Sequence, residues 1–313
     1  MKYYIHAKNH LLILILVLPT IASAQIWFRD DFDGTSLNTD EWFQRPRAVD
    51  RPLGRTQTGP SPIIGGGLAR LTFNTYNADA PGILFSGTEM LTLTKYSLDA
   101  PGVEGLEFKT SMRVGLPLAN GLVAGFFTFG RDGFDRNGEG GVGGFDEIDI
   151  EILSNLINEP INPGRTQEIL VNVFDGQTNG NTVELGPWLM DISTINLSEF
   201  NTYTIRWFAD KIEWFINDQE LFTLTAAEGA AALADSEQGL HFNLWAPSDS
   251  FDTAFDPVLM PTANPALNET YFMEVDYVQI AAIPEPSIFG FYLAGMAGLG
   301  ILLKRKCSLG KRG

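Results

Sequence analysis

The chain has 313 residues, 44% of them hydrophobic, and carries 38 acidic against 21 basic residues, a formal net charge of −17. So acidic a chain repels nucleic acids and other polyanions, which argues against both as partners. Its single cysteine, Cys307, excludes an intrachain disulfide, so a large apolar core must stabilise the fold.

The first 24 residues have the order of a secretory signal peptide. Lys2 and Lys8 give a basic start, an apolar run covers residues 11–21, and Ala22-Ser23-Ala24 supplies small residues for cleavage. An uncleaved anchor helix is the alternative, but the run is short for a membrane span. We therefore expect residues 1–24 to direct export.

The middle of the chain is more acidic than the whole. The first 24 residues hold two basic residues and 288–313 hold five, so 21 − 7 = 14 basic residues face 38 acidic ones, a net charge of −24. A neutral partner fits this surface better than a sulfated one. His241 is the one histidine between residues 25 and 287, which excludes a His-rich metal site and weakens a Ser-His-Asp triad.

Residues 25–282 are predicted to form one all-β domain. Apolar and polar residues alternate over 106–114, and strands are expected at 202–215 (divided at Ala209-Asp210), 221–224, 240–245 and 271–281. Asn217-Asp218 marks a turn, and an Ala-rich helix is expected at 226–235. Many short strands with polar turns predict an antiparallel β-sandwich.

The most informative strand covers residues 145–153. Ile148, Ile150 and Ile152 point to one face, and Phe145 lies on the other face. That second face also carries three carboxylates, Glu147, Asp149 and Glu151. Like charges on one strand face repel one another, so this arrangement does not serve stability.

Paired carboxylates are what glycoside hydrolysis requires, one as nucleophile or base and one as acid. The Cα atoms of Glu147 and Glu151 are about 13 Å apart on a straight strand. Side chains leaning together across a concave strand close most of that gap. Asp149 between them raises the proton affinity of a neighbouring Glu. A solvated acidic face and a calcium site are the alternatives that the residues leave open.

With its Glu-x-Asp-x-Glu pattern at 147–151, the chain resembles glycoside hydrolase family 16, the laminarinase and licheninase group. The resemblance extends to residues 30–42, 121–129, 200–217, 243–245 and 275–278. Among the differences, Leu91 stands where licheninases usually have Arg, and Asn201 where the family usually has His.

The resemblance implies a concanavalin A-like jelly roll with a concave glycan cleft and a retaining mechanism. Glu147 would be the nucleophile, Asp149 the assisting carboxylate and Glu151 the general acid/base. No cofactor would be required, although some members bind a structural calcium, whose matching positions are Asp276 with the carbonyls of Asp31 and Gly67. The implied cleft contacts are Glu89, Phe145, Asn172, Phe174, Asn243 and Trp245.

The C-terminal residues 283–313 are expected to form a second sorting device. Pro284-Glu285-Pro286 precedes an apolar stretch at 288–303, and five basic residues follow it. This order resembles the PEP-CTERM sorting signal, which implies recognition by processing machinery at the inner membrane and delivery to the cell envelope or outside. An ordinary membrane anchor is the alternative.

These features predict an exported, monomeric, endo-acting β-glucanase that cleaves β-1,3 or mixed-linked glucan. A transglycosylase would use the same residues. A non-catalytic module that binds exopolysaccharide and a matrix protein without a glycan site are alternatives from other functional classes.

Overall fold

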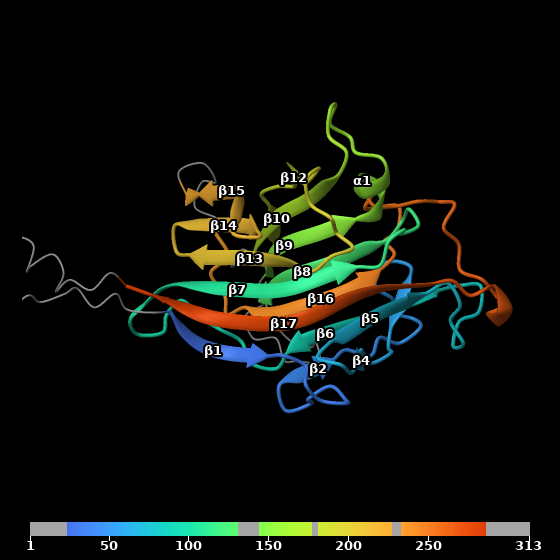
Figure 1. The fold of residues 1–313 in the computed structure, drawn as a ribbon, viewed down its shortest axis with the longest axis horizontal. Helices are drawn as coiled ribbons and strands as arrows, with labels where there is room; N and C mark the ends of the chain where they lie inside the picture. Colours follow the sequence, from blue (N-terminus) through green and yellow to red (C-terminus); the bar gives the residue numbers. More distant parts are fainter. Residues whose placement is uncertain (1–23, 131–143, 177–180, 227–232, 286–313) are drawn as a thin grey trace, which may run out of the picture. The chain divides into compact units, whose positions relative to one another are not determined.

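The structure, a computed structural model, describes residues 24–285 except 131–143, 177–180 and 227–232 (Figure 1). Nearly all of the predicted signal peptide and of the C-terminal sorting segment lies outside these residues, and so does most of the helix expected at 226–235. No helix in the described part of the chain is long and apolar enough to cross a membrane.

One antiparallel sheet carries the strand with the three carboxylates. Its strands follow the order β2, β6, β16, β8, β9 and β10, and β10 also pairs with β11 and β12. The bounds are β2 Trp42–Gln44, β6 Phe85–Thr92, β8 Val123–Gly130, β9 Asp146–Leu153, β10 Glu168–Gly176, β11 Thr182–Glu184, β12 Trp188–Asp191 and β16 Gly239–Trp245. We call it the site sheet.

The opposing sheet is built around two long strands, β7 and β17, which pair along most of their length (Figure 1). On one side β13, β14 and β15 follow β7, and on the other β5 and β1 pair with successive parts of β17. The bounds are β1 Gln25–Asp30, β3 Thr56–Thr58, β4 Ile63–Ile64, β5 Ala69–Asn74, β7 Val103–Val114, β13 Asn201–Phe208, β14 Lys211–Ile216, β15 Gln219–Thr225 and β17 Thr270–Pro284.

The predicted strand pattern is confirmed. The division at Ala209-Asp210 separates β13 from β14. Asn217 and Asp218, which form the predicted turn, have positive φ values of 52° and 60°. Asn and Asp tolerate this left-handed conformation, which tight hairpin turns require. The fold is thus the all-β antiparallel sandwich that the alternation predicts.

The core lies between the two sheets and is rich in aromatic residues. Trp207 and Trp214 of the opposing sheet are fully buried, as are Phe126 and Phe242 of the site sheet. Burial of such large rings supplies the main favourable free energy of folding, since the described residues contain no cysteine with which to form a disulfide.

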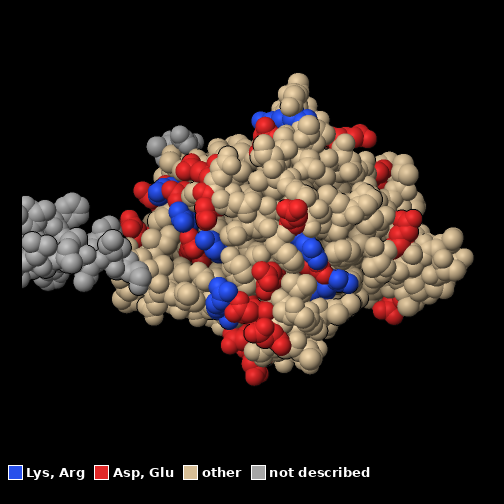
Figure 2. Space-filling view, viewed as in Figure 1, with Lys and Arg blue, Asp and Glu red and all other residues tan. Residues whose placement is uncertain are grey.

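Ion pairs join neighbouring strands on the opposing sheet. Glu274 of β17 is 1% exposed and binds both Arg70 and Arg113, and Glu107 of β7 binds Arg206 of β13. Figure 2 shows such basic and acidic side chains next to one another on one face of the molecule. The arginines of this sheet therefore have acidic partners.

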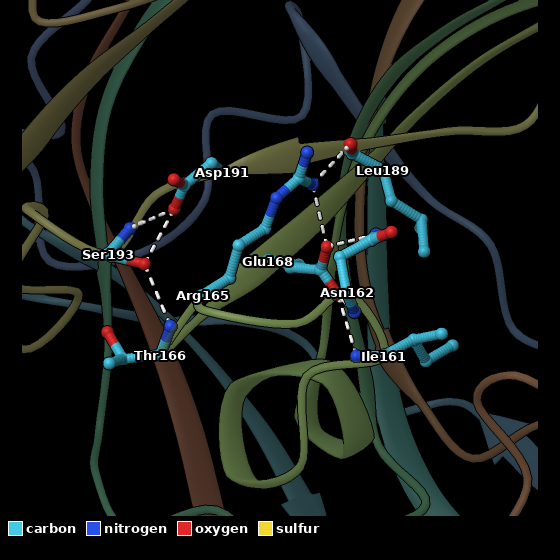
Figure 3. Close-up of polar contacts among 8 residues, drawn as sticks. All are labelled: Ile161, Asn162, Arg165, Thr166, Glu168, Leu189, Asp191 and Ser193. Carbon is cyan, nitrogen blue, oxygen red and sulfur yellow. Dashed lines mark hydrogen bonds and ion pairs between the residues drawn. The ribbon is translucent and has the colours of Figure 1, made fainter.

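One short helix, α1 (Ser154–Asn158), follows β9 directly, and a 3-10 turn, η1, covers Pro265–Leu267; neither was predicted. The loop after α1 is held by Glu168 at the start of β10 (Figure 3). Its carboxylate accepts hydrogen bonds from the backbone of Ile161 and Asn162 and from Arg165, which also donates to the carbonyl of Leu189 in β12. Although burial opposes it, these hydrogen bonds lower the pKa of Glu168.

A second link in Figure 3 ties the same loop to the end of β12. Ser193 donates to the carboxylate of Asp191 and accepts from the backbone amide of Thr166. Together, the two networks fix the start of β10, the strand that lies next to the carboxylate strand β9.

Candidate active site

β9 has the two faces that its alternation predicts. Ile148, Ile150 and Ile152 are 0% exposed and belong to the core. Glu147, Asp149 and Glu151 take the opposite face, and all three line one cavity of about 470 Å³. The three carboxylates therefore share a concave site, which excludes a simple solvated strand face.

The strands beside β9 determine what surrounds each carboxylate. In register, Glu147 lies between Phe129 of β8 and Phe174 of β10, and Asp149 lies between Phe127 and Asn172.

Glu151 faces Gly125 on β8 and Leu170 on β10. The glycine is required for space, since a Cβ at Gly125 would lie 2.5 Å from Oδ1 of Asn243 on the adjacent strand β16. Gly125 therefore opens the cleft next to Glu151, a role that the sequence did not indicate.

The cavity is lined by every cleft residue that the resemblance implies and by several that it does not. The implied residues are Glu89, Phe145, Asn172, Phe174, Asn243 and Trp245. The additional ones include Arg45, Arg47, Phe127, Phe129, Glu184 and His241.

Unpartnered polar atoms concentrate in this cavity. Among the described residues, buried side-chain atoms without a hydrogen-bond partner include five that belong to its lining. Buried polar groups are normally hydrogen-bonded, and exceptions need an explanation. The five atoms are Arg45 Nε, Asp149 Oδ1, His241 Nδ1, Asn243 Oδ1 and Trp245 Nε1.

Burial and mutual repulsion keep protons on the carboxylates. Burial raises the pKa of Glu147 to about 7, assisted by the charge of Glu89 and opposed by a hydrogen bond with Asp149. Burial, with the charges of Glu147 and Glu184, raises the pKa of Glu151 to about 8. The pKa of Asp149 is raised well above its usual value by burial and by both glutamates. Near pH 7 the site can thus hold one carboxylate as a base and another as an acid.

Aromatic rings form a wall at the Glu147 end. Phe145 stacks on Phe129 with ring centroids 5.5 Å apart, and Phe174 lies 5.6 Å from Phe145. A wall of this kind suits a pyranose, whose C–H face is apolar.

Two of the implied contacts are held by neighbours that the sequence did not indicate. Asn172 donates to the carboxylate of Glu184 on β11 at 2.8 Å, and its carbonyl oxygen accepts from Gly186 at 3.1 Å. Glu89, 3% exposed, binds Nε of Arg47 at 3.3 Å. Arg47 is therefore the cationic partner of Glu89, and Leu91 is buried.

Asp146, beside Glu147, fixes the end of the carboxylate strand. It is 2% exposed, and its carboxylate accepts three backbone hydrogen bonds, from Gly176 at 2.6 Å, Asp235 at 3.1 Å and Ser236 at 2.7 Å. These bonds join β9 to the end of β10 and to the segment before β16. Asp146 therefore holds Glu147 in place from outside the cavity.

The calcium positions implied by the resemblance lie together at one edge of the fold. A Cβ on Gly67 would be 3.9 Å from the carbonyl oxygen of Asp31. The carboxylate of Asp31 is bound by Arg29, whose raised pKa also reflects the charge of Asp276. One carboxylate and two carbonyls beside an arginine are a poor donor set for a divalent cation. In the described part of the chain, no group of three acidic, His or Cys side chains is placed so that it could hold a metal ion.

Comparison with known proteins supports the resemblance. Residues 107–258 match the model of Glycosyl hydrolases family 16, a range that includes β9. A β-glucanase of Brevibacillus brevis is 29% identical over 125 residues, which are 40% of this chain and only 39% of that protein.

Solved structures share the fold at low identity. A β-1,3-1,4-glucanase (lichenase) from a mouse hindgut metagenome superposes with a TM-score of 0.58 at 17% identity, over 82% of this chain and 99% of that one. The β-glucanase of Bacillus licheniformis gives a TM-score of 0.58 at 18% identity, over 82% and 97%. The jelly-roll fold expected from the sequence is confirmed.

Proposed function

We propose that this chain is a glycoside hydrolase of family 16 that cleaves internal bonds of a β-glucan with retention of configuration. One observation carries the proposal: Glu147, Asp149 and Glu151 share one face of β9 in a cavity whose lining holds unpartnered polar atoms. A fold that only needed stability would not collect three partly desolvated carboxylates.

The assigned roles follow from the surroundings of each group. Glu147, with a pKa of about 7, ionises more readily than Glu151 and attacks the anomeric carbon. Glu151, with a pKa of about 8, holds the proton that it donates to the departing glycosidic oxygen. Asp149 hydrogen-bonds Glu147 and sustains the proton affinity of Glu151.

The second half of the reaction reverses the proton transfer. The departure of the first product leaves Glu151 ionised, so it removes a proton from water as the water attacks the glycosyl ester on Glu147. Glu147 is released as a carboxylate and Glu151 regains its proton. A sugar hydroxyl in place of water gives transglycosylation on the same residues.

The substrate class rests on the relatives. The proteins with the same fold include a β-1,3-1,4-glucanase and a β-1,3-glucanase of Pyrococcus furiosus, so we assign a β-1,3 or mixed-linked glucan main chain. The cavity of about 470 Å³ with its aromatic wall fits sugar units in an open cleft.

The cellular setting is inferred from the two ends of the sequence. Residues 1–24 direct export, and residues 283–313 sort the protein to the cell envelope by way of the inner membrane. Hydrolysis then takes place on or outside the cell surface. We assign no cofactor to the reaction.

The proposal is tested by incubating the purified protein with lichenan, laminarin, xyloglucan and agarose and measuring reducing ends. We expect release from a glucan, and none from the Glu147→Gln variant. Glu104→Gln, which replaces an exposed carboxylate outside the cavity lining, should retain full activity. Binding without hydrolysis by the unaltered protein would instead indicate a glycan-binding module.

A further inference from the structure

The cleft has a cationic end, across the site sheet from the carboxylates. Arg45 and Arg47 follow β2 and line the same cavity as Glu147. β2 pairs with β6, which pairs with β16, and β8 then separates β16 from β9. At the other side Glu184 of β11 adds negative charge. The charge that lines the cleft therefore changes from positive beside β2 to negative beside β9 and β11.

The two arginines differ in their pairing. Arg47 binds the buried carboxylate of Glu89. The guanidinium of Arg45 makes no ion pair with a described residue, and its Nε is buried without a hydrogen-bond partner. Arg45 as a whole is half-buried, but its buried Nε has lost its hydrogen bonds to water without a protein partner to replace them, which is costly.

Most other arginines in the described part of the chain have protein partners for their donors. Arg113, Arg165 and Arg206 each bind a carboxylate, and Arg55 donates to three backbone carbonyls. Arg45 differs from them, because it lines a ligand cavity and keeps an unpartnered donor. The missing partner is therefore expected on the ligand.

His241 supports the same interpretation. It is 4% exposed, lies 4.9 Å from the Phe127 ring, and its Nδ1 also lacks a partner. Burial and the charges of Arg45, Lys95 and Arg47 hold the pKa of His241 well below its usual value. A neutral imidazole beside the cations can hydrogen-bond a polar group without adding to their repulsion.

We infer that Arg45, assisted by Arg47 and His241, forms a subsite for a sugar unit that carries an oxyanion, a carboxylate or a sulfate. The inference rests on the proposed function: it places an acidic unit on the glucan at a distance from the bond that is cleaved. A planar guanidinium binds either oxyanion through paired hydrogen bonds. The net negative charge of the protein does not prevent binding of an oxyanion, since the ligand interacts mainly with the charges nearest to it, those of Arg45 and Arg47.

The test compares three forms of one glucan: unmodified, partly oxidised at C6 to the carboxylate, and partly sulfated. For each, kcat/KM is measured with the unaltered protein, Arg45→Gln and Arg51→Gln. Arg51 is exposed and outside the cavity lining, so it is the matched control. We expect an acidic form to be preferred, and Arg45→Gln to lower the ratio of acidic to unmodified kcat/KM by about tenfold. Arg51→Gln should leave the ratio unchanged. The preferred oxyanion distinguishes the carboxylate from the sulfate.

Failure of the subsite and failure of the catalytic proposal give different results. Hydrolysis with no acidic preference, or with a ratio that Arg45→Gln leaves unchanged, overturns the subsite and leaves the glucanase assignment standing. If no form is hydrolysed, calorimetric titration of the same three forms of the glucan into the protein decides. Binding of an acidic form that weakens in Arg45→Gln then supports the subsite alone, and equal binding by both proteins overturns it.

Discussion

Nε1 of Trp214 donates a hydrogen bond of 3.0 Å to the backbone carbonyl oxygen of Asp149. Trp214 belongs to β14 of the opposing sheet and Asp149 to β9 of the site sheet, so this bond crosses the core. It fixes the middle of the carboxylate strand from the core side of the site sheet. The core of this fold therefore also positions the site.

Trp214→Phe tests this link. The variant loses the indole donor and part of the ring volume, and we expect unfolding to become easier by about 1–3 kcal/mol and kcat to fall more than KM changes. Trp207→Phe is the control, because Nε1 of Trp207 binds the carbonyl of Ala234 at 2.8 Å and not the carboxylate strand. Similar kcat values in the two variants would show that Trp214 has no positioning role.

The dependence of activity on pH follows from the two glutamates. Glu147 must be ionised and Glu151 protonated, so with pKa values of about 7 and about 8 the rate should be highest between these pH values and fall on both sides. In Glu184→Gln, loss of a nearby negative charge should move the alkaline limb to lower pH. A profile of kcat/KM in both proteins checks this, and an alkaline limb that does not move contradicts the assignment.

Asp149→Asn should stabilise the folded protein in alkaline solution. The carboxyl groups ionise near pH 4 in the unfolded chain but at higher pH in the folded one, so folded stability falls as pH rises through the folded pKa values. Removing the central carboxylate relieves this loss, by about 1–2 kcal/mol at pH 9 and by little at pH 4. Urea denaturation at the two pH values measures the difference. A variant that is less stable at pH 9 would count against repulsion in the site.

Gly125→Ala should block the cleft while leaving the fold intact. The added Cβ would approach Oδ1 of Asn243 to 2.5 Å, which displaces a side chain that faces the ligand. We expect kcat/KM to fall about tenfold or more, since small misplacements in a site are costly. Gly59→Ala, where the Cβ meets no atom within 4 Å, is the control. Equal activity of both variants would show that Gly125 does not shape the site.

The parts of the site that alternation encodes could be predicted from the sequence. Isoleucines at every second position of β9 place Glu147, Asp149 and Glu151 on one face, and the strand boundaries around Ala209-Asp210 follow from the same rule. Tertiary packing decides the rest.

Arg45 and Arg47 were not expected in the cleft, because they follow a strand of three residues whose pattern is too short to interpret. Glu184 lies on a strand of the same length. Arg47 binds Glu89 although the two residues are 42 positions apart in the sequence. Such partners are set by how the strands meet in space.

The configuration of the first product tests the central claim most directly. The glucan on which activity is found is cleaved in deuterated buffer, and the new reducing end is followed by proton nuclear magnetic resonance before mutarotation is complete. If Glu147 forms a covalent glycosyl ester that Glu151 helps to hydrolyse, the β-anomer appears first and the α-anomer grows later. If the α-anomer appears first, water attacks the sugar directly, and the proposed roles of Glu147 and Glu151 are wrong.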